Sequence, residues 1–380
     1  MTKITADWLT SDASQRVCKM LTDAGHEAWF VGGCVRNTLI GAPVSDLDLS
    51  TSALPDETLS LAECAGLKAI PTGKDHGTIT VVADGIPYEV TTFRKDIATD
   101  GRRAVVAFAK TMEEDARRRD FTMNALYADQ TGTIADPLGG LPDLNARRVR
   151  FIENPDLRIK EDYLRILRFF RFHAWYGEAE EGIDAEGLAA CADNVDGIET
   201  LSQERIGQEM MKLFAAPNPA PAVASFAASG GLMRVLPGAD AGMLAQLIHI
   251  EELAGIEPDP LRRLAMLASS ETAASLRLSK KDLTRLEVMR EIDTRPGLLG
   301  YRHGADLAID ALAVRAASVG LAIVDGDMVA ARHGAIQTFP LKAADLLPTH
   351  QGPALGKALK DAEDRWIASG FTLTKDDLLG

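Results

Sequence analysis

The sequence predicts an α+β protein, in which a small mixed β-sheet head with helices is followed by an all-helical neck, body and tail. Two observations support this fold class. Short runs typical of strands are confined to the first third of the chain, at 28–31, 46–50, 78–83, 86–93, 125–128 and 133–135. From about residue 141 onward, helical periodicity dominates and Ala and Leu are abundant.

The change from strand-like to helical sequence patterns sets the expected domain boundaries. The run Asp136-Pro137-Leu138-Gly139-Gly140 breaks the chain where the strands end. We therefore expect a head over 1–140, a helical neck over 141–215, and a helical body and tail over 216–380.

Local signals predict further elements within the head. Residues 11–24 have the spacing of an amphipathic helix. The pair Asp84-Gly85 between two strand-like runs predicts a hairpin. The polar, turn-rich stretch 95–104 predicts a mobile loop.

Composition bounds the class of protein. The chain has 380 residues, which favours two or three domains, and its hydrophobic and charged fractions of 46% and 25% are ordinary for a globular protein. No apolar stretch approaches the length of a membrane span, the start has no signal-peptide pattern, and the four cysteines are scattered without a Cys-x-x-Cys pair. We therefore expect a cytoplasmic protein with reduced thiols. The net charge of −14 argues against indiscriminate nucleic-acid binding, although a local basic groove remains compatible with it.

Two carboxylates two positions apart are the strongest chemical signal in the head. In a strand, Asp46 and Asp48 fall on one face and the apolar Leu47 and Leu49 on the other. Adjacent like charges repel unless a cation lies between them, and a pair of hard oxygen ligands suits Mg²⁺. Upstream, Gly32-Gly33 joins an apolar run to a helix-like segment, an arrangement that favours anion binding. The combination predicts phosphoryl or nucleotidyl transfer.

Five motifs follow one another within residues 30–215, namely Gly32 to Arg36, Asp46 to Asp48, Glu89 to Arg94, Arg118 to Ala125 and Glu161 to Phe172. In this order they resemble one family, the bacterial-type (class II) tRNA nucleotidyltransferases, which include CCA-adding enzymes and bacterial poly(A) polymerases. The resemblance implies that residues 1–140 form a nucleotidyltransferase catalytic head and that the neck carries a base-reading helix. It also implies that the body and tail bind tRNA.

The resemblance implies roles for the head residues. Asp46, Asp48 and Glu89 would be the catalytic carboxylates, with Asp46 and Asp48 as ligands of Mg²⁺, two ions in all. Gly33 and Arg36 would hold the triphosphate, and Arg119 would contact the nucleotide. The family has Asp after this arginine, where the chain has Asn37.

Segment 158–172, projected as one helix, separates a charged face from an apolar face. Arg158, Glu161, Asp162, Arg165 and Arg168 share the charged face, and Arg171 projects away from it. By the resemblance, Asp162 and Arg165 would read the base, and Arg168 and Arg171 would steady the nucleotide or the helix. A carboxylate that only accepts and a guanidinium that only donates match the pairing edges of C and A, and mismatch those of U and G.

Contacts to RNA are expected on the helical part of the chain. The candidates are Arg147, Arg148, Arg150, Lys280, Lys281, Arg285 and Arg290. His76, in a further family motif, is expected to be structural.

The favoured function is template-independent addition of CCA to the acceptor arm of tRNA from CTP and ATP, with release of pyrophosphate. Addition of CC alone or of A alone, and a bacterial poly(A) polymerase, remain open. A catalytically silent RNA-binding protein and a small-molecule adenylyltransferase are further alternatives. The sequence predicts no membrane association and identifies no protein partner.

Overall fold

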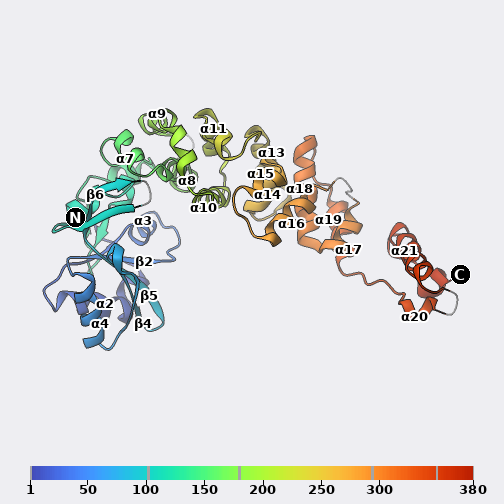
Figure 1. The fold of residues 1–380 in the computed structure, drawn as a ribbon, viewed down its shortest axis with the longest axis horizontal. Coiled ribbons are helices and arrows are strands. Elements are labelled where there is room, and N and C mark those ends of the chain that lie inside the picture. Colours follow the sequence, from blue (N-terminus) through green and yellow to red (C-terminus); the bar gives the residue numbers. More distant parts are fainter. Residues whose placement is uncertain (1, 101–102, 179–180, 292–294, 348–349, 380) are drawn as a thin grey trace. The chain divides into compact units, whose positions relative to one another are not determined.

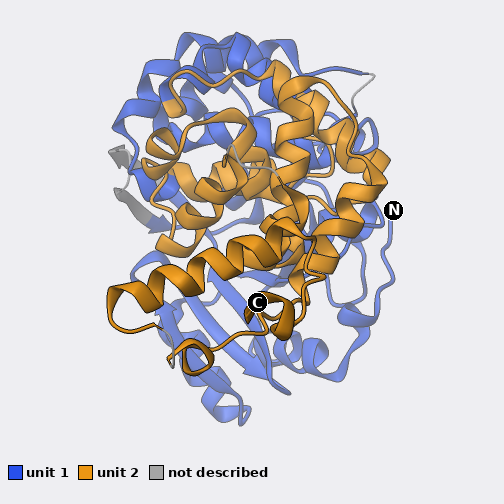
Figure 2. Ribbon diagram, turned by 90° about the vertical axis from the view of Figure 1, so that its right-hand side faces the viewer, with its two compact units in different colours: residues 1–205, 221–234 blue, residues 206–220, 235–380 orange. Residues whose placement is uncertain are grey.

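The computed structural model describes residues 2–100, 103–178, 181–291, 295–347 and 350–379 (Figure 1). The chain forms two compact units, coloured separately in Figure 2. Unit 1 comprises residues 1–205 and 221–234, and unit 2 comprises residues 206–220 and 235–380. Unit 1 therefore contains the expected head together with most of the expected neck. The three-part division at residues 140 and 215 stays a prediction.

A seven-stranded mixed sheet organises the head, in the order β3-β4-β5-β2-β1-β8-β9. Strands β2 and β5 pair in parallel, and the other neighbours are antiparallel. The bounds are β1 Ala28–Val31, β2 Leu47–Thr51, β3 Lys68–Gly73, β4 Thr78–Ala83, β5 Ile86–Thr92, β8 Tyr127–Ala128 and β9 Ile134–Ala135. The predicted mixed-sheet head is thus confirmed.

The pattern of side chains explains the central strands. Leu47 and Leu49 of β2 are buried, as the alternating sequence requires of a sheet with one covered face. Asp84 and Gly85 both have positive φ, at 50° and 81°, the conformation of a tight hairpin turn. They join β4 to β5 in the predicted hairpin.

The prediction of a mobile loop over 95–104 is wrong. Strands β6, Arg94–Asp100, and β7, Arg103–Phe108, pair there as a separate antiparallel hairpin. Backbone pairing between the two segments outweighs the polar, turn-rich composition, which is a weak signal by itself. Residues 101–102 lie outside the described part of the chain.

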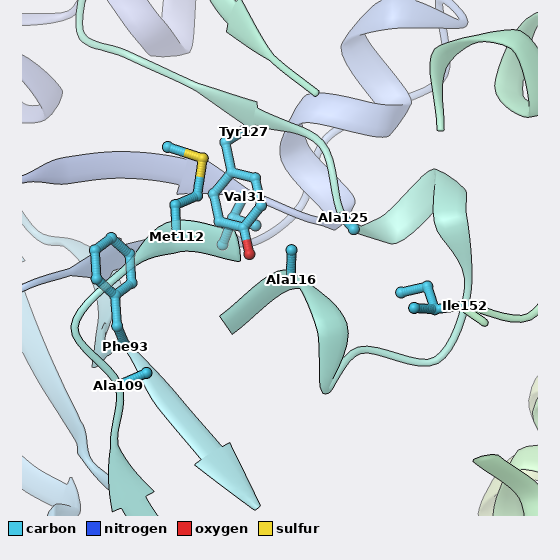
Figure 3. Close-up of a cluster of buried hydrophobic side chains, with 8 residues drawn as sticks. All are labelled: Val31, Phe93, Ala109, Met112, Ala116, Ala125, Tyr127 and Ile152. Carbon is cyan, nitrogen blue, oxygen red and sulfur yellow. The ribbon is translucent and has the colours of Figure 1, made fainter. Parts of the chain in front are cut away.

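Helices of the head pack against its strands and fix the segments that carry functional residues. Those of the head are α1 Asp7–Thr10, α2 Asp12–Thr22, α3 Gly33–Leu39, α4 Pro55–Cys64 and α5 Met112–Arg117, with single 3₁₀ turns η1 Lys74–His76 and η2 Thr122–Asn124. Helix α2 matches the helix expected over 11–24. Figure 3 shows how α5 is anchored: Met112 and Ala116 converge with Val31, Phe93 and Tyr127 in a buried cluster.

Beyond β9, the described residues form helices and connecting segments without further strands, as expected for the neck, body and tail. Their bounds are α6 Leu141–Asn145, α7 Pro155–Glu161, α8 Leu164–Tyr176, α9 Ala185–Asp193, η3 Val195–Thr200, α10 Gln203–Phe214, α11 Ala220–Ala228, α12 Gly231–Val235, α13 Gly242–Ala254, α14 Pro260–Leu267, α15 Ser270–Ala274, α16 Lys280–Met289, α17 Pro296–His303, α18 Ala305–Val319, α19 Asp325–Ala335, α20 Ala343–Leu346, α21 Pro353–Ala368 and α22 Lys375–Leu379. None of the described helices is long and apolar enough to cross a membrane.

The single helix predicted over 158–172 is wrong, because the chain breaks at Asp162. Asn154 caps the start of α7 by accepting the N–H of Leu157, and α7 ends at Glu161. Asp162 is extended, with φ −155° and ψ 105°, and its Oδ1 accepts the N–H of Leu164 at 3.1 Å. Asp is prone to such local side-chain-to-backbone bonds, which compete with helix continuation. The break changes which side chains of α7 and α8 share a face.

Aromatic packing joins α8 to the head within unit 1. The ring of Phe121 lies 5.0 Å, centroid to centroid, from Phe151 and from Phe172. Phe151 stacks on Phe169 at 5.2 Å. Tilted and stacked ring pairs of this kind stabilise a junction beyond the area that they bury. Helix α8 is therefore packed, through Phe169 and Phe172, against the segment that follows α5.

Unit 2 has a buried charge network at its centre. Glu251 of α13 accepts from the guanidinium groups of Arg262 and Arg263 of α14, and Arg262 also pairs with Asp310 of α18 at 2.6 Å. All four side chains are less than a tenth exposed. Arg263 in addition donates to the backbone carbonyl of Phe214, at the end of α10. Buried charges are tolerated only when paired and hydrogen-bonded in this way.

Candidate active site

A cavity of about 660 Å³ in unit 1 gathers most of the residues singled out in the sequence. This volume is typical of small-molecule sites. Its lining includes Gly33, Arg36, Asp46, Asp48, Arg119, Asp162, Arg165 and Arg168. Glu89 and Arg171 are not among the lining residues. Seven arginines and four aspartates line the cavity, a positive balance that suits a polyphosphate.

The carboxylates meet where β2 and β5 run side by side. Asp48 lies opposite Glu89 in the parallel register, so both side chains project from the same face. Burial, together with the neighbouring charges of Glu89 and Asp46, raises the pKa of Asp48 to about 6 against the opposing influence of Arg119. Asp46 lies just before β2 and is exposed, as is Glu89. The side chains form a concentrated negative charge that a cation would relieve.

The donor set fits a magnesium ion bound jointly by protein and substrate. Among the described residues, no group of three or more His, Cys, Asp or Glu side chains is arranged to hold a metal ion alone. Mg²⁺ is usually held by one or two carboxylates, water and substrate phosphates, so a complete cage of protein ligands is not required. Asp46 and Asp48 supply the oxygen donors that such a site needs.

The turn at Gly32 and the helix α3 that follows it place backbone groups and the Arg36 side chain at the cavity. Gly32 has φ 71°, which favours glycine, and a Cβ there would lie 3.6 Å from Nη1 of Arg119. The guanidinium of Arg36 is buried, and it donates to Oδ1 of Asn37, to Oδ1 of Asn124 and to the hydroxyl of Tyr176. Most of its five N–H groups are therefore used within the protein, which makes Arg36 a clamp between α3 and α8.

Asn37 also has a specific place in this clamp. Its side-chain oxygen accepts from Arg36, and its side-chain nitrogen donates to the carbonyl of Pro43 at 2.7 Å. An ionised Asp could make only the first of these contacts, because it has no donor. The amide thus closes the loop that precedes β2, where the sequence departs from the pattern that it resembles.

Asp120 connects the head to α8. It accepts from Asn124 at 2.8 Å and from both Nε and Nη2 of Arg168. Burial alone would raise the pKa of Asp120, but Arg168 and Asn124 hold it well below its usual value. Both bonds from Arg168 go to Oδ2 of Asp120, and they fix Arg168 at the wall of the cavity.

Asp162 and Arg165 both line the cavity, and each has an ion-pair partner of its own. The carboxylate of Asp162 pairs with Arg205 at 2.6 Å. Arg165 pairs with Glu161 through Nη1 and donates through Nη2 to the backbone carbonyl of Arg118 at 3.1 Å. Asp162 lies between α7 and α8, so it does not share a helix with Arg165.

Several lining residues were missed in the sequence. Arg205 is far from the recognised motifs, and no local signal marks it. Arg94 and Arg118 also line the cavity and lie inside motifs that resembled the family, so the resemblance could have singled them out. Arg171, by contrast, places its guanidinium over the ring of Phe172, 4.5 Å from the centroid.

Three of the candidates for RNA contact have partners within the protein. Arg150 pairs with Asp143, Arg285 with Asp259 and Asp310, and Arg290 donates to the carbonyls of Ala265 and Ala268. Arg148 of unit 1, and Lys280 and Lys281 at the start of α16, are exposed.

Comparisons with known proteins agree with this geometry. Residues 28–150 match the family described as the poly A polymerase head domain, and residues 182–243 match a probable RNA- and SrmB-binding site of polymerase A. The CCA tRNA nucleotidyltransferase 1, mitochondrial, of Homo sapiens is 30% identical over 98% of this chain and 90% of its own length. The CCA-adding enzyme of Geobacillus thermodenitrificans is 42% identical over 58% of this chain, and the match spans 54% of that enzyme, about half its length.

A solved structure extends the likeness to the fold. The crystal structure of the Bacillus stearothermophilus CCA-adding enzyme in complex with CTP has a TM-score of 0.72 and 27% identity, and covers 95% of this chain and 94% of that one. The fold and cavity thus define a nucleotidyltransferase of the poly(A) polymerase type. Within that class, the chain belongs to the family of the CCA-adding tRNA nucleotidyltransferases. Nucleotidyltransferases of the poly(A) polymerase family generally depend on a divalent metal.

Proposed function

We propose that this protein adds C, C and A, from CTP and ATP, to the 3′ end of tRNA without a nucleic-acid template and with release of pyrophosphate. The observation that carries the proposal is the single cavity in which paired carboxylates, arginines and the Asp162–Arg165 segment meet. The likeness to enzymes that are named for CCA addition supports this choice of reaction.

In this proposal Asp46, just before β2, and Asp48 of β2 would hold Mg²⁺, two ions in the full site, and Glu89 would add negative charge beside Asp48. When bound, the metal lowers the pKa of the attacking 3′-hydroxyl and neutralises the charge that develops on the phosphates.

The arginines of the cavity bind and orient the triphosphate. Arg119 has two of its nitrogens held by protein groups, and its Nη1 lies against the Gly32–Gly33 turn. An anion at this turn meets a pre-oriented guanidinium and backbone N–H groups, which lowers the entropic cost of alignment. Arg36 contributes mainly by fixing α3, since most of its donors are already used.

Base selection follows from donors and acceptors around the chain break. The Asp162 carboxylate retains acceptor capacity beyond its bonds to Leu164 and Arg205. Arg165 Nε forms no hydrogen bond with the described residues, so Arg165 can still donate. An acceptor beside a donor complements the pairing edges of C and A. Against U or G, like groups face each other and stay unpaired, which is the strong form of discrimination.

Binding of the tRNA acceptor arm is assigned to the helical part of the chain. Exposed Arg148, Lys280 and Lys281 are available for phosphate contacts, whereas Arg150, Arg285 and Arg290 are engaged within the protein. A structured RNA of this kind is recognised mostly through shape and backbone.

The direct test is incorporation of each labelled nucleoside triphosphate into a tRNA that lacks its CCA, with and without Mg²⁺. We expect incorporation from CTP and ATP but not from UTP or GTP, and none after chelation of the metal. Incorporation from CTP alone or ATP alone would assign the protein to a CC-only or A-only activity, and unlimited incorporation from ATP to a poly(A) polymerase. Absence of any incorporation would contradict the proposal.

A further inference from the structure

Asp115 is a buried carboxylate at the centre of a hydrogen-bond cluster beneath the cavity. Its side chain is fully inaccessible to solvent. Its Oδ1 accepts from Nε of Arg118 at 2.8 Å. Its Oδ2 accepts from Nη2 of Arg119 at 3.0 Å, from the hydroxyl of Tyr127 at 2.9 Å and from Oγ of Ser50 at 3.2 Å. One carboxylate thus holds two arginines that line the cavity.

Both arginines neutralise this buried charge. Burial alone would raise the pKa of Asp115, but Arg119 and Arg118 hold it well below its usual value. A buried carboxylate is costly, and it is stable here because each oxygen accepts hydrogen bonds from charged or strongly polar donors. Asp115 is therefore ionised at neutral pH and acts as a buried anionic anchor.

The cluster leaves one end of Arg119 directed at the cavity. Its Nε donates to the hydroxyl of Tyr127, and its Nη2 donates to Ser50 and Asp115. Its Nη1 has no hydrogen-bond partner among the described residues and lies 3.6 Å from the position of a Cβ on Gly32. Three of the five N–H groups fix the plane of the guanidinium, so the remaining pair points toward the glycine turn.

Ser50 links the same cluster to the catalytic strand. It lies on β2 two residues after Asp48, and its hydroxyl contacts both Asp115 and Arg119. Asp115 and Ser50 thus connect Arg119, which is proposed to bind the triphosphate, to β2, the strand that carries Asp48. A first layer of ligands placed by a rigid second layer is the arrangement that precise catalytic geometry requires.

We propose that Asp115 is a positioning residue for nucleotide binding, which holds Arg119 so that its free Nη1 meets the phosphates of the incoming triphosphate. This inference rests on the proposed nucleotidyl transfer. Asp115 touches no substrate, and it acts through Arg119 and, to a lesser degree, Arg118.

The first test compares Asp115→Asn with Glu113→Gln, a matched loss of one negative charge from an exposed residue of the same helix. For Asp115→Asn we expect the KM for ATP and for CTP to rise about tenfold, the scale of one charge-assisted contact, with kcat and the KM for tRNA little changed. Glu113→Gln should match the wild-type protein. Wild-type nucleotide KM values for Asp115→Asn would overturn the proposal.

A double-mutant cycle separates positioning from general support of the fold. If Asp115 acts through Arg119, then Asp115→Asn should add little to the rise in nucleotide KM caused by Arg119→Gln. Fully additive effects would show that Asp115 acts elsewhere and would overturn the proposal. Equilibrium binding of ATP to each variant without tRNA gives the same comparison independently of turnover. A wild-type protein that binds ATP but does not extend tRNA would contradict the proposed function and not this inference.

Tyr127→Phe is the second variant, for use if Asp115→Asn does not fold. The Tyr127 ring is buried in the cluster of Figure 3, so phenylalanine keeps the packing and removes only the hydroxyl that bridges Asp115 and Arg119. We expect a smaller rise in nucleotide KM, which Arg119→Gln should abolish. Unchanged KM values in a folded Tyr127→Phe protein would overturn the proposal.

Discussion

The carboxylate of Asp162 forms an ion pair with the guanidinium of Arg205, 43 residues further along the chain, at 2.6 Å. Both side chains are about a quarter exposed, and both line the candidate active site. The residue proposed to accept a hydrogen bond from the base is thus held by an arginine from α10, the helix that leads from unit 1 into unit 2. Base selection should therefore depend on Arg205.

Replacement of Arg205 by alanine should relax nucleotide choice. Without its partner, Asp162 loses a fixed position and keeps only the contact to Leu164. We expect misincorporation of UTP, relative to CTP, to rise by about tenfold, with a smaller effect on tRNA affinity. Arg165→Ala and Asp162→Ala should act in the same direction.

Arg234→Ala is the matched control, because Arg234 also belongs to unit 1 and pairs with Asp196 away from the cavity. The measurement is the incorporation rate of each nucleotide under single-turnover conditions. Equal rejection of UTP and GTP by the wild-type and Arg205→Ala proteins would exclude a role for this ion pair in selection.

Removal of a carboxylate from β2 should abolish transfer without unfolding the head. Asp48→Asn keeps the size of the side chain but removes charge beside Glu89. We expect turnover to fall by about 10³-fold or more, since the metal would lose a ligand at the reacting phosphate. Asp46→Ala should have a similar effect.

Asp75→Asn, an exposed acidic residue outside the cavity, provides the control for loss of charge. Near-normal turnover of Asp48→Asn with Mg²⁺ would show that the metal assignment is wrong. Thermal unfolding of each variant checks that loss of activity is not loss of fold.

Because of the buried charge network, a substitution that removes one charge should lower the stability of unit 2. Glu251→Gln leaves Arg262 and Arg263 with one fewer buried counter-charge. We expect the free energy of unfolding to fall by about 3 kcal/mol, the scale of a broken buried ion pair. Urea unfolding gives this value, and Glu252→Gln, at the exposed neighbouring position of α13, should change it little. Equal stability of the two variants would contradict a stabilising role for the network.

The head should lose stability in acid through Asp120. The pKa of Asp120 is lowered in the folded protein, so its contribution is present above its unfolded value and is lost as pH falls through and below it. We expect the urea midpoint to decrease between about pH 5 and pH 3. Asp120→Asn should be less stable at neutral pH and show a smaller decrease over this range. The same decrease in both proteins would show that other groups cause the acid sensitivity.

The sequence predicted the sheet well because its signals are local. The alternation around Leu47 and Leu49 and the Asp84-Gly85 turn are decided by neighbouring residues, and the structure matches them. The seven-strand order could not be predicted in this way. The parallel pairing of β2 with β5, which brings Asp48 beside Glu89, depends on a crossover that no short pattern encodes.

The candidate site was predictable where motifs are contiguous and unpredictable where the fold joins distant segments. Asp46, Asp48 and Arg119 lie in short motifs, and all three line the cavity. The partner of Asp162 was missed because the sequence projection treated 158–172 as one helix, whereas Asp162 is extended and its carboxylate pairs with Arg205 from a distant segment. Asp115 carries no sequence signal that sets it apart, and only packing shows that it is buried.

Sequencing the 3′ ends of a tRNA transcript that lacks CCA, after incubation with the protein, Mg²⁺, CTP and ATP, distinguishes CCA addition from the alternative reactions. We expect that CCA is added and that synthesis then stops. A run of A residues that continues past this point, or a transcript that remains unextended while the wild-type protein is folded, would contradict CCA addition.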